Sequence, residues 1–387
     1  MGSNPDVLVV GAGIAGASTA FHLAERGVAV TLLERSTPAS GPTGRSGALS
    51  HSFYFMPELS QLARNGTNFL RTMPERLGHP SGFCEVGLLW GFGEGLVDEV
   101  TGAVERVAQE GTPIEVLTPE QMLEHAPGFT TDGLAIALWE PSAGYPDPAT
   151  ATAGIVAAAR HRGATVRLNT PISRLSTDGS RVTGVETRDG ERIEAGTTVL
   201  ATGPWTKPIL DEIGVSLPLT MERHSIMALD VPDRAREILP FLWCDDTLVH
   251  YARPDGDHRV LIGSWAGGGT GYRHPDVPRA EVSNPDVYQQ TVSDREAAWN
   301  LELMLPRLPA LADLPFGKGW ACVYDMSPDD GPVIGPVAGM DGLVVVAGSS
   351  GHGLKLGPAV GEEVARLVTT GEAPLLAPFS PDRFGQA

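Results

Sequence analysis

The sequence predicts a two-domain protein of the α/β and α+β classes, with a Rossmann-type domain assembled from discontinuous segments. Three observations predict this fold. A glycine-rich loop joins a short apolar strand to a helix near the start, and two later segments, one in mid-chain and one at the end, each combine a buried strand with a helix. The stretches between them predict a second domain, built on a mixed or antiparallel β-sheet flanked by helices. The 387 residues are enough for both domains.

The first forty residues contain a complete strand–helix–strand unit. Val7–Val10 is an all-apolar run, as expected for a parallel strand that is buried on both faces. The glycine loop 11–16 follows, then an Ala- and Leu-rich helix over 17–26 and a second strand over 28–33. A glycine loop in this position between a strand and a helix is typical of dinucleotide binding.

Each glycine of this loop has a physical role. Gly11 allows the tight turn, Gly13 lets a pyrophosphate approach the backbone, and Gly16 lets the helix pack closely on the strand. The helix N-terminus presents free N–H groups and a partial positive charge to the phosphates. We therefore expect the diphosphate to be bound by the backbone of Gly11, Gly13, Ile14, Ala15 and Gly16.

An acid at the end of the second strand predicts ribose recognition. Glu34 lies 23 residues after Gly11, where a carboxylate accepts hydrogen bonds from the adenosine ribose and disfavours the 2′-phosphate of NADP. Arg35 is a candidate to flank the adenine or the ribose, although an exposed arginine after a strand is equally ordinary. This unit alone leaves FAD and NAD both open.

Two further segments complete the predicted Rossmann-type domain. In mid-chain, an Ala-rich helix at Pro148–His161 is followed by four expected strands, at 164–168, 171–175, 182–187 and 197–201. At the end of the chain, a strand at 343–347 leads through a glycine loop at 348–353 to a helix at 358–369.

These segments set the predicted domain limits. The first domain is expected to comprise residues 5–60, 148–205 and 325–385. The second, substrate-binding domain is expected to comprise residues 61–147 and 206–324. Its flanking helices are predicted at Val97–Gln109 and 293–305.

Composition excludes several classes of partner and site. Lys and Arg number 28 and Asp and Glu 47, so the formal net charge of −19 argues against nucleic acid and against an anionic membrane as partners. The three cysteines are far apart and predict neither a disulfide framework nor a metal site. No apolar run reaches about 18 residues, and Val7–Val10 leads into a glycine loop rather than a signal-peptide cleavage site. We expect a cytoplasmic monomer or small homo-oligomer that acts on a small molecule.

Six motifs in order give a resemblance that runs nearly end to end. The chain resembles the FAD-dependent amine oxidoreductases of the D-amino acid oxidase superfamily, closest to the sarcosine oxidase and glycine oxidase branch. The resemblance implies FAD rather than NAD. It also implies oxidation of the C–N bond of a secondary amine or amino acid to an imine by hydride transfer to flavin N5, with reoxidation by O₂ or an electron acceptor. The motifs are 11–16 with Glu34, 43–47 (TGRSG), 144–148 (GYPDP), 199–205 (VLATGPW), 322–330 (CVYDMSPDD), and 348–353 leading to Lys355.

The glycine loop near the end of the chain is expected at the flavin. In the family this loop lies by the pyrimidine ring, and its lysine also meets the substrate carboxylate, so Gly351, His352, Gly353 and Lys355 are expected to stabilise the reduced flavin. The alternative is a glycine-rich turn with a solvated lysine. The resemblance also implies cofactor contacts from Arg45, Ser46, Thr202, Gly203 and Trp205, where the alternative for the first two is a mobile polar loop.

Cys322 is a candidate for covalent flavin attachment. In sarcosine oxidases a cysteine at this place in the motif forms a thioether to the flavin 8α-methyl, which requires a thiolate. The alternative is a buried apolar cysteine in a strand. Cys84 and Cys244 lack such a context and are interpreted as structural cysteines.

Aromatic and basic residues of the second domain are candidates for the substrate pocket. Tyr251 lies on an expected strand where the family places a substrate-facing tyrosine, and Trp265 ends the next strand. His51, Arg223 and His224 complete the set. Aromatic walls would exclude water and favour a neutral or weakly cationic amine. For each residue the alternative is a half-buried ring or side chain of the second domain.

Two departures from the sarcosine oxidase pattern concern mechanism. His51 stands where those enzymes use an arginine to bind the substrate carboxylate, which points to another clamp such as Arg223, to a larger substrate, or to one without a carboxylate. Leu261 stands where they use a lysine that speeds reaction with oxygen, so oxidase and dehydrogenase activities both stay open.

Two other functional classes also fit parts of the sequence. One is a redox-silent FAD-binding subunit that scaffolds a multi-protein complex. The other is an NAD-dependent dehydrogenase that uses the same first unit.

Overall fold

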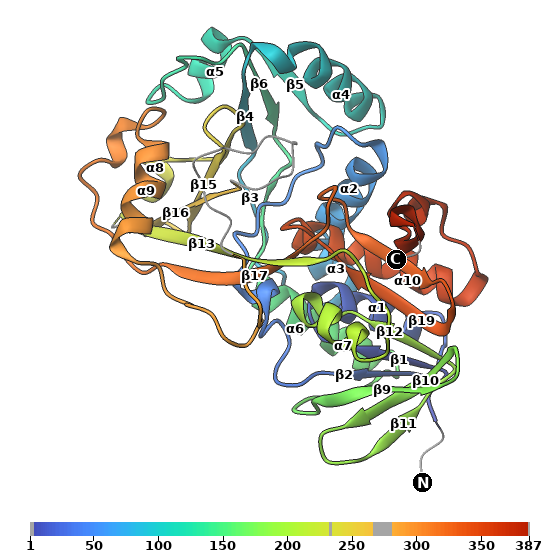
Figure 1. Ribbon diagram of the computed structural model, residues 1–387. Coiled ribbons are helices and arrows are strands. Elements are labelled where there is room, and N and C mark those ends of the chain that lie inside the picture. Colours follow the sequence, from blue (N-terminus) through green and yellow to red (C-terminus); the bar gives the residue numbers. More distant parts are fainter. Residues whose placement is uncertain (1–3, 232–233, 266–280, 386–387) are drawn as a thin grey trace.

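Two large β-sheets and the helices packed on them form the computed structural model (Figure 1). The structure describes residues 4–231, 234–265 and 281–385. A nine-stranded sheet occupies the lower part of Figure 1 and an eight-stranded sheet the upper part. The fold class predicted from the sequence is confirmed.

The nine-stranded sheet carries the predicted Rossmann-type core. Its central strands run in the order β19-β12-β1-β2-β8 and pair in parallel. Strand β18 pairs with β19 in antiparallel orientation, and β10, which is antiparallel to β9 and β11, joins β19 in parallel. All of the residues in β1 and β2 are buried. Val7 and Val9 pack with helical residues on one face, and Leu8 and Val10 pack with residues of the β9–β11 segment on the other. The strands are β1 Val7–Val10, β2 Val30–Leu33, β8 Thr165–Arg167, β9 Ile172–Asp178, β10 Arg181–Thr187, β11 Arg192–Glu194, β12 Thr197–Leu200, β18 Val333–Val337 and β19 Met340–Ala347.

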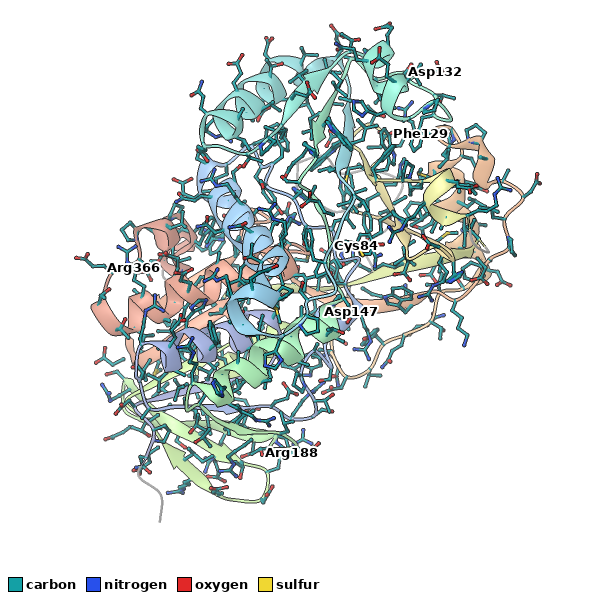
Figure 2. All side chains as sticks on the ribbon, turned by 180° about the vertical axis from the view of Figure 1, so that it is seen from behind. Cys84, Phe129, Asp132, Asp147, Arg188 and Arg366 are labelled. Atoms are coloured by element: carbon teal, nitrogen blue, oxygen red, sulfur yellow. The ribbon has the colours of Figure 1, made fainter. Side chains whose placement is uncertain are left out.

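Helices from distant parts of the chain pack on this sheet. Helix α1 (Ile14–Glu25) contacts both α6 (Pro148–His161) and α10 (Gly353–Thr370), and α10 also contacts α2 (Pro57–Arg71). Asp147, labelled in Figure 2, caps α6 by accepting the Thr150 N–H at 2.7 Å. Glycines make these contacts close, since a Cβ at Gly16 would overlap the carbonyl oxygen of Gly11 and one at Gly66 that of Lys355.

The eight-stranded sheet is mostly antiparallel and forms the second predicted layer. Its order is β17-β13-β16-β15-β14-β4-β6-β5, and only the β14–β4 pair is parallel. The strands are β4 Leu88–Phe92, β5 Glu115–Leu117, β6 Ile136–Glu140, β13 Thr220–Asp230, β14 Leu242–Asp245, β15 His250–Asp255, β16 Arg259–Ser264 and β17 Trp320–Met326.

Shorter elements complete the described structure. Strands β3 (Cys84–Glu85) and β7 (Gly144–Tyr145) form a small separate sheet. The remaining α-helices are α3 Met73–Leu77, α4 Val97–Gln109, α5 Pro119–His125, α7 Thr206–Asp211, α8 Ala235–Ile238 and α9 Asp294–Met304. The 3₁₀ helices are η1 Pro42–Arg45, η2 Glu94–Leu96, η3 Gly203–Trp205, η4 Pro309–Leu311, η5 Pro374–Phe379 and η6 Pro381–Phe384.

Most predicted elements coincide with observed ones, and one boundary differs in a way that affects the site. The predicted helices at Pro148–His161 and Val97–Gln109 are found with the same limits. The last helix begins at Gly353 instead of 358, so Pro358 lies inside α10. A proline removes one helical hydrogen bond, and the buried packing of the first turns on α1 and α2 outweighs that loss. Lys355 is therefore in the first turn of a helix.

The two sheets follow the predicted segments of the chain. Every strand of the nine-stranded sheet lies within 5–60, 148–205 or 325–385, and the eight-stranded sheet departs from the other segments only at the last two residues of β17. Helix α2 is divided by the predicted limit at residue 60 and packs on α10. The domain limits themselves stay a prediction.

The α2–α10 contact gives a stability prediction. We expect Gly66→Ala to lower the unfolding free energy by about 1–3 kcal/mol, because the new methyl group overlaps the backbone oxygen of Lys355 and must displace α10. The matched control is Gly102→Ala on the exposed face of α4, where a Cβ meets nothing within 4 Å; it should stabilise by about 0.5–1 kcal/mol. Thermal unfolding of both variants checks this, and equal melting temperatures would contradict it.

Candidate active site

A cavity of about 520 Å³ runs along the carboxyl ends of the central parallel strands. Val10, Leu33, Ala201 and Val346 line it, and they lie at or just beyond the ends of β1, β2, β12 and β19. Ligands of open α/β sheets bind at this edge, because the strand ends and the helix N-termini meet there. The cavity therefore lies where the sequence predicts the dinucleotide.

The glycine loop forms the middle of this cavity. Gly11 has φ +100°, and a Cβ there would overlap the carbonyl oxygen of Ala201, so only glycine fits. The N-cap residue of α1 is Gly13, which has no side chain to cap the helix. Instead, the Ile14 N–H donates to Thr43 Oγ1 at 3.2 Å. Gly11, Gly13, Ile14 and Ala15 line the cavity, and Gly16 does not because it packs against the loop itself. This backbone can receive a diphosphate.

Glu34 is buried at one end of the cavity. Its carboxylate accepts the backbone N–H groups of Ala12 and Ser36, each at 2.8 Å. These two bonds fix the carboxylate at the end of β2 while the side chain still lines the cavity. The geometry fits an acceptor for ribose hydroxyls.

Arg35 also lines this cavity, and it pairs with Asp286, a residue that was not predicted from the sequence. Its guanidinium lies 3.8 Å from the ring centroid of Trp205 and forms an ion pair with Asp286 at 2.9 Å. All three residues line the cavity, as do Thr202 and Gly203. No short motif marks Asp286, because it comes from a different part of the chain.

A second cavity, of about 120 Å³, continues from the first. Four residues line both cavities and mark their junction: Ser46, Tyr324, Gly351 and Leu354. The eight-stranded sheet supplies one wall of the second cavity, and α10 with the loop before it supplies another. An extended cofactor that starts at Glu34 can therefore reach this smaller space with its far end.

Lys355 brings a buried positive charge to the second cavity. Its side chain is 6% exposed, and its ammonium lies 5.5 Å from the ring centroid of Tyr54. Burial lowers the pKa of Lys355 to about 8, while the nearby Cys244 and Glu140 raise it. Gly351, His352 and Gly353 lead into this residue, and all four line one or both cavities. The alternative of a solvated lysine is wrong.

Two neutral histidines lie beside this charge. His352 Nδ1 is 2.8 Å from the Tyr54 hydroxyl, and burial together with Lys355 lowers the pKa of His352 to about 3. His51 stacks on Tyr54 with ring centroids 5.3 Å apart, and burial, Lys355 and His352 hold its pKa well below the usual value. Both imidazoles line the second cavity in the neutral form.

Aromatic rings form part of the wall of the second cavity. Tyr251 and Trp265 are parallel within 1°, with centroids 6.1 Å apart, and His224 stacks on Tyr324 at 4.2 Å. A Cβ at Gly263 would overlap the Tyr251 hydroxyl, so this glycine makes room for the ring. The predicted pocket residues Tyr251, Trp265 and His224 line the second cavity, and so does Tyr324.

Several residues of the site carried no signal that sequence reasoning detected. Trp90 and Cys244 line the second cavity from β4 and β14, and Cys244 is also buried in the hydrophobic core, as predicted. Glu140 lies behind it, fully buried, and accepts the Ser52 N–H with both oxygens, at 2.8 and 3.0 Å. Burial raises the pKa of Glu140 to about 7. In the sequence, Glu140 is marked only as an acid in the otherwise apolar segment that forms β6.

Four predicted site residues line neither cavity: Gly16, Arg45, Arg223 and Cys322. Arg223 donates to the carbonyl oxygens of Gln289 and Thr291 and pairs with Glu296, so its guanidinium is occupied outside both cavities. The proposed role of Arg223 as a carboxylate clamp is corrected on this ground. Arg45 donates to the carbonyl oxygen of Ser40 at 2.6 Å and thereby closes its own loop; only its neighbour Ser46 lines the cavities.

Cys322 and Leu261 are buried in the second sheet near the loop of Arg45. Cys322 Sγ lies 4.0 Å from the Arg45 carbonyl oxygen, and burial raises the pKa of its thiol to about 12. The residue directly opposite it on β13 is His224. Leu261 packs with Ile226 and Ala228, and Trp320 packs against this cluster. The covalent link stays a prediction.

Searches for other kinds of site gave two results. Within the described ranges, no group of three or more His, Cys, Asp or Glu side chains is placed to hold a metal ion. No helix in the part of the chain that the structure describes combines the length and the apolar character needed to cross a membrane.

Comparison with known proteins identifies the family. The DAO model, described as FAD dependent oxidoreductase, matches residues 6–367. The chain belongs to this family. The resemblance predicted from the motifs is thus confirmed, and so are FAD as the cofactor and an oxidoreductase as the class of enzyme. The NAD-dependent alternative is wrong.

Named relatives show how far the similarity extends. The chain is 28% identical to 4-methylaminobutanoate oxidase (formaldehyde-forming) of Paenarthrobacter nicotinovorans over 94% of its own length, but spans only 43% of that protein. It is 28% identical to monomeric sarcosine oxidase of Streptomyces avermitilis, covering 99% of this chain and 98% of the relative. The crystal structure of L-proline dehydrogenase from P. horikoshii matches with a TM-score of 0.86 and 25% identity over 99% of this chain and 98% of that one.

The position of Glu34 gives a prediction on cofactor binding. We expect Glu34→Ala to weaken FAD binding about 10-fold or more, because the acceptor facing the cavity and two loop hydrogen bonds are lost together. The dissociation constant is measured by titrating apoprotein with FAD, in a Cys322→Ser background so that a covalent link cannot mask the loss. Glu372→Ala, at an exposed position just after α10, is the control. Equal affinities would place ribose recognition elsewhere.

Proposed function

We propose that this protein oxidises the C–N bond of a secondary amine or an amino acid to an imine, which water then hydrolyses. The observation that carries the proposal is the character of the second cavity. The described residues that line it include no Asp, Glu or Arg; Lys355 is charged below about pH 8, and beside it lie five aromatic rings and the neutral imidazoles of His51 and His352. Bound FAD would supply the hydride acceptor at the junction of the two cavities.

The charge of this cavity bears on the state of the amine. A protonated amine would meet Lys355 at close range, without a carboxylate among the described lining residues to compensate. The cavity therefore favours the neutral amine, which is the form that can lose a hydride from the adjacent carbon. The aromatic walls of Tyr251, Trp265 and Trp90 exclude water from this carbon.

The relatives support the same chemistry. Monomeric sarcosine oxidase and glycine oxidase are matched over almost their whole length, and both are named as oxidases of amino acids or N-methyl amino acids. A redox-silent subunit is less well supported, because nothing in such a role requires a buried ammonium next to the cofactor junction.

The reoxidant, either O₂ or an electron acceptor, is part of the proposal. The sequence contains three lysines, Lys207, Lys318 and Lys355, and only Lys355 lines a cavity. It is thus the one lysine positioned to promote a reaction with oxygen. The cytoplasmic location and the monomeric or small homo-oligomeric state are proposed on sequence grounds alone.

Anaerobic flavin bleaching tests the proposed reaction. We expect at least one member of a panel of amino acids, N-methyl amino acids and cyclic amines to bleach the flavin absorbance in stopped flow. Admitting air should restore the absorbance, and hydrogen peroxide formed in step would identify O₂ as the reoxidant. A panel that leaves the flavin oxidised throughout would favour the redox-silent subunit.

Lys355 gives a prediction on pH dependence. We expect Lys355→Met to weaken sulfite binding to the flavin about 10-fold or more, because the ammonium no longer stabilises an anion beside the ring. Since the pKa of Lys355 is lowered to about 8, its charge is present below that pH and lost above it. Sulfite affinity of the unmodified protein should therefore fall as the pH rises through about 8. A pH profile unchanged in Lys355→Met would remove this residue from the flavin site.

The covalent link is tested by denaturation. We propose that Cys322 carries the flavin, so acid precipitation should leave the flavin on the protein, and Cys322→Ser should release it into the supernatant. Two positive charges, on Arg45 and Arg223, lower the thiol pKa against the larger effect of burial. Cys84→Ser, in the separate two-stranded sheet of β3 and β7, is the control. Free flavin from the unmodified protein would end this idea.

A further inference from the structure

A segment of the predicted substrate-binding domain lies at the cofactor site. Residues 283–286 line the first cavity, and they belong to the chain between β16 and α9. Asp286 pairs with Arg35, the residue that follows Glu34. Because Glu34 fits an acceptor for ribose hydroxyls, this end of the cavity suits the adenosine half of FAD. The second domain therefore adds a wall to a site that the sequence assigns to the first domain.

Both ends of this segment are attached to the eight-stranded sheet. We call residues 282–291 the strap. At its start, the Val282 N–H donates to the Met221 carbonyl oxygen on β13 at 2.9 Å. Near its end, the Gln290 carbonyl oxygen accepts the N–H of Ala321 on β17 at 2.8 Å. Strands β13 and β17 are neighbours, so the strap leaves and rejoins the same edge of the sheet while its middle lines the first cavity.

Arg223 strengthens the attachment at the end of the strap. Its guanidinium donates to the carbonyl oxygens of Gln289 and Thr291, at 2.7 and 2.8 Å, and pairs with Glu296 in the first turn of α9. Guanidinium hydrogen bonds are directional, so three acceptors around one arginine fix the path of the backbone between them. Arg223 on β13 thus acts on the strap and not on the second cavity.

A local turn directs the middle of the strap toward the cofactor domain. The Asp286 N–H donates to Asn284 Oδ1 at 2.9 Å, and Pro285 between them restricts the backbone. The Asp286 carboxylate pairs with Arg35 at 2.9 Å, and the same guanidinium lies 3.8 Å from the ring centroid of Trp205. Arg35 therefore connects the strap to the turn that follows β12.

The ion pair at this contact is charged but weak. Burial raises the pKa of Asp286, but Arg35, Trp205 and Arg188 together lower it below its usual value, so the carboxylate is ionised at neutral pH. Arg188, labelled in Figure 2, lines the same cavity. The side chains of Arg35 and Asp286 are 42% and 52% exposed, and exposed ion pairs contribute a factor of about 5 or less to an equilibrium. Such a contact holds the strap in place and still opens readily.

We propose that the strap is a cofactor-binding element. It encloses the adenosine half of FAD, and the Arg35–Asp286 pair is the contact that opens when FAD enters or leaves. Arg223 is the positioning residue that keeps the strap over this end of the cavity. The inference uses the membership of the chain in an FAD-dependent family and does not depend on amine oxidation. Its consequence is that the second domain limits the rate of FAD release.

FAD release from the loaded protein tests the strap. The measurements use a Cys322→Ser background, so that a covalent link cannot hold the flavin, and follow the rise in flavin fluorescence after dilution. We expect Asp286→Asn and Arg35→Gln each to speed release about 3–5-fold at low salt, because each removes the same exposed ion pair. The double variant should release FAD at about the rate of the faster single variant.

Two controls separate the strap from general charge effects and from the flavin end of the site. Asp294→Asn, which removes an exposed acid in the first turn of α9, should leave the release rate unchanged. Sulfite affinity of the flavin should be the same in Asp286→Asn and in the Cys322→Ser parent, since the strap acts at the adenosine end. Arg223→Gln should also speed release, because the strap loses an anchor.

Four results would overturn the inference. They are a release rate in Asp286→Asn equal to that of the parent, single effects that multiply in the double variant, an equal effect of Asp294→Asn, and a changed sulfite affinity in Asp286→Asn. If Arg223→Gln fails to fold, the Arg35 and Asp286 variants decide, because both of these side chains are at the surface.

Discussion

The burial of one ammonium group constrains the whole site. Lys355 lies in the first turn of α10, where the helix N-terminus already carries partial positive charge. Removing its charge from water is costly, and Glu140 and Cys244 compensate only in part, since the pKa of Lys355 is still lowered to about 8. The same positive charge helps to keep His51 and His352 neutral. The second cavity therefore combines a positive region with walls that, among the described residues, hold no Asp, Glu or Arg.

Close helix packing holds this charge in position. Gly66 of α2 lies against the carbonyl oxygen of Lys355, and α10 also packs on α1, the helix that follows the dinucleotide loop. The helix that presents phosphate-binding N–H groups and the helix that presents the ammonium are thus in direct contact. Because interiors of this kind are closely packed, this contact restricts how far the two helix N-termini can move relative to each other.

The first unit of the fold could be predicted in detail because its signals are local. The strand at Val7–Val10, the turn at Gly11 and the acid Glu34 lie within one stretch of chain, and each residue type follows from a short-range requirement. Helices α4 and α6 were also predictable to the residue from apolar patterning. The start of α10 was predicted at residue 358, because a proline usually lies near the start of a helix. The helix begins at Gly353, because burial of its first turns against two helices outweighs the local effect of Pro358.

By itself, the sequence determined the Rossmann-type core, the FAD family and the presence of Lys355, since these depend on contiguous motifs. Only the tertiary structure decided which side chains of the second sheet face the cavity. It turned Arg223 and Arg45 toward carbonyl oxygens, and it brought Trp90, Cys244 and Glu140 to the site from strands far apart in the chain. The physical reason is that a side chain's direction in a strand depends on register and on its partners across the sheet, and those partners are distant in sequence.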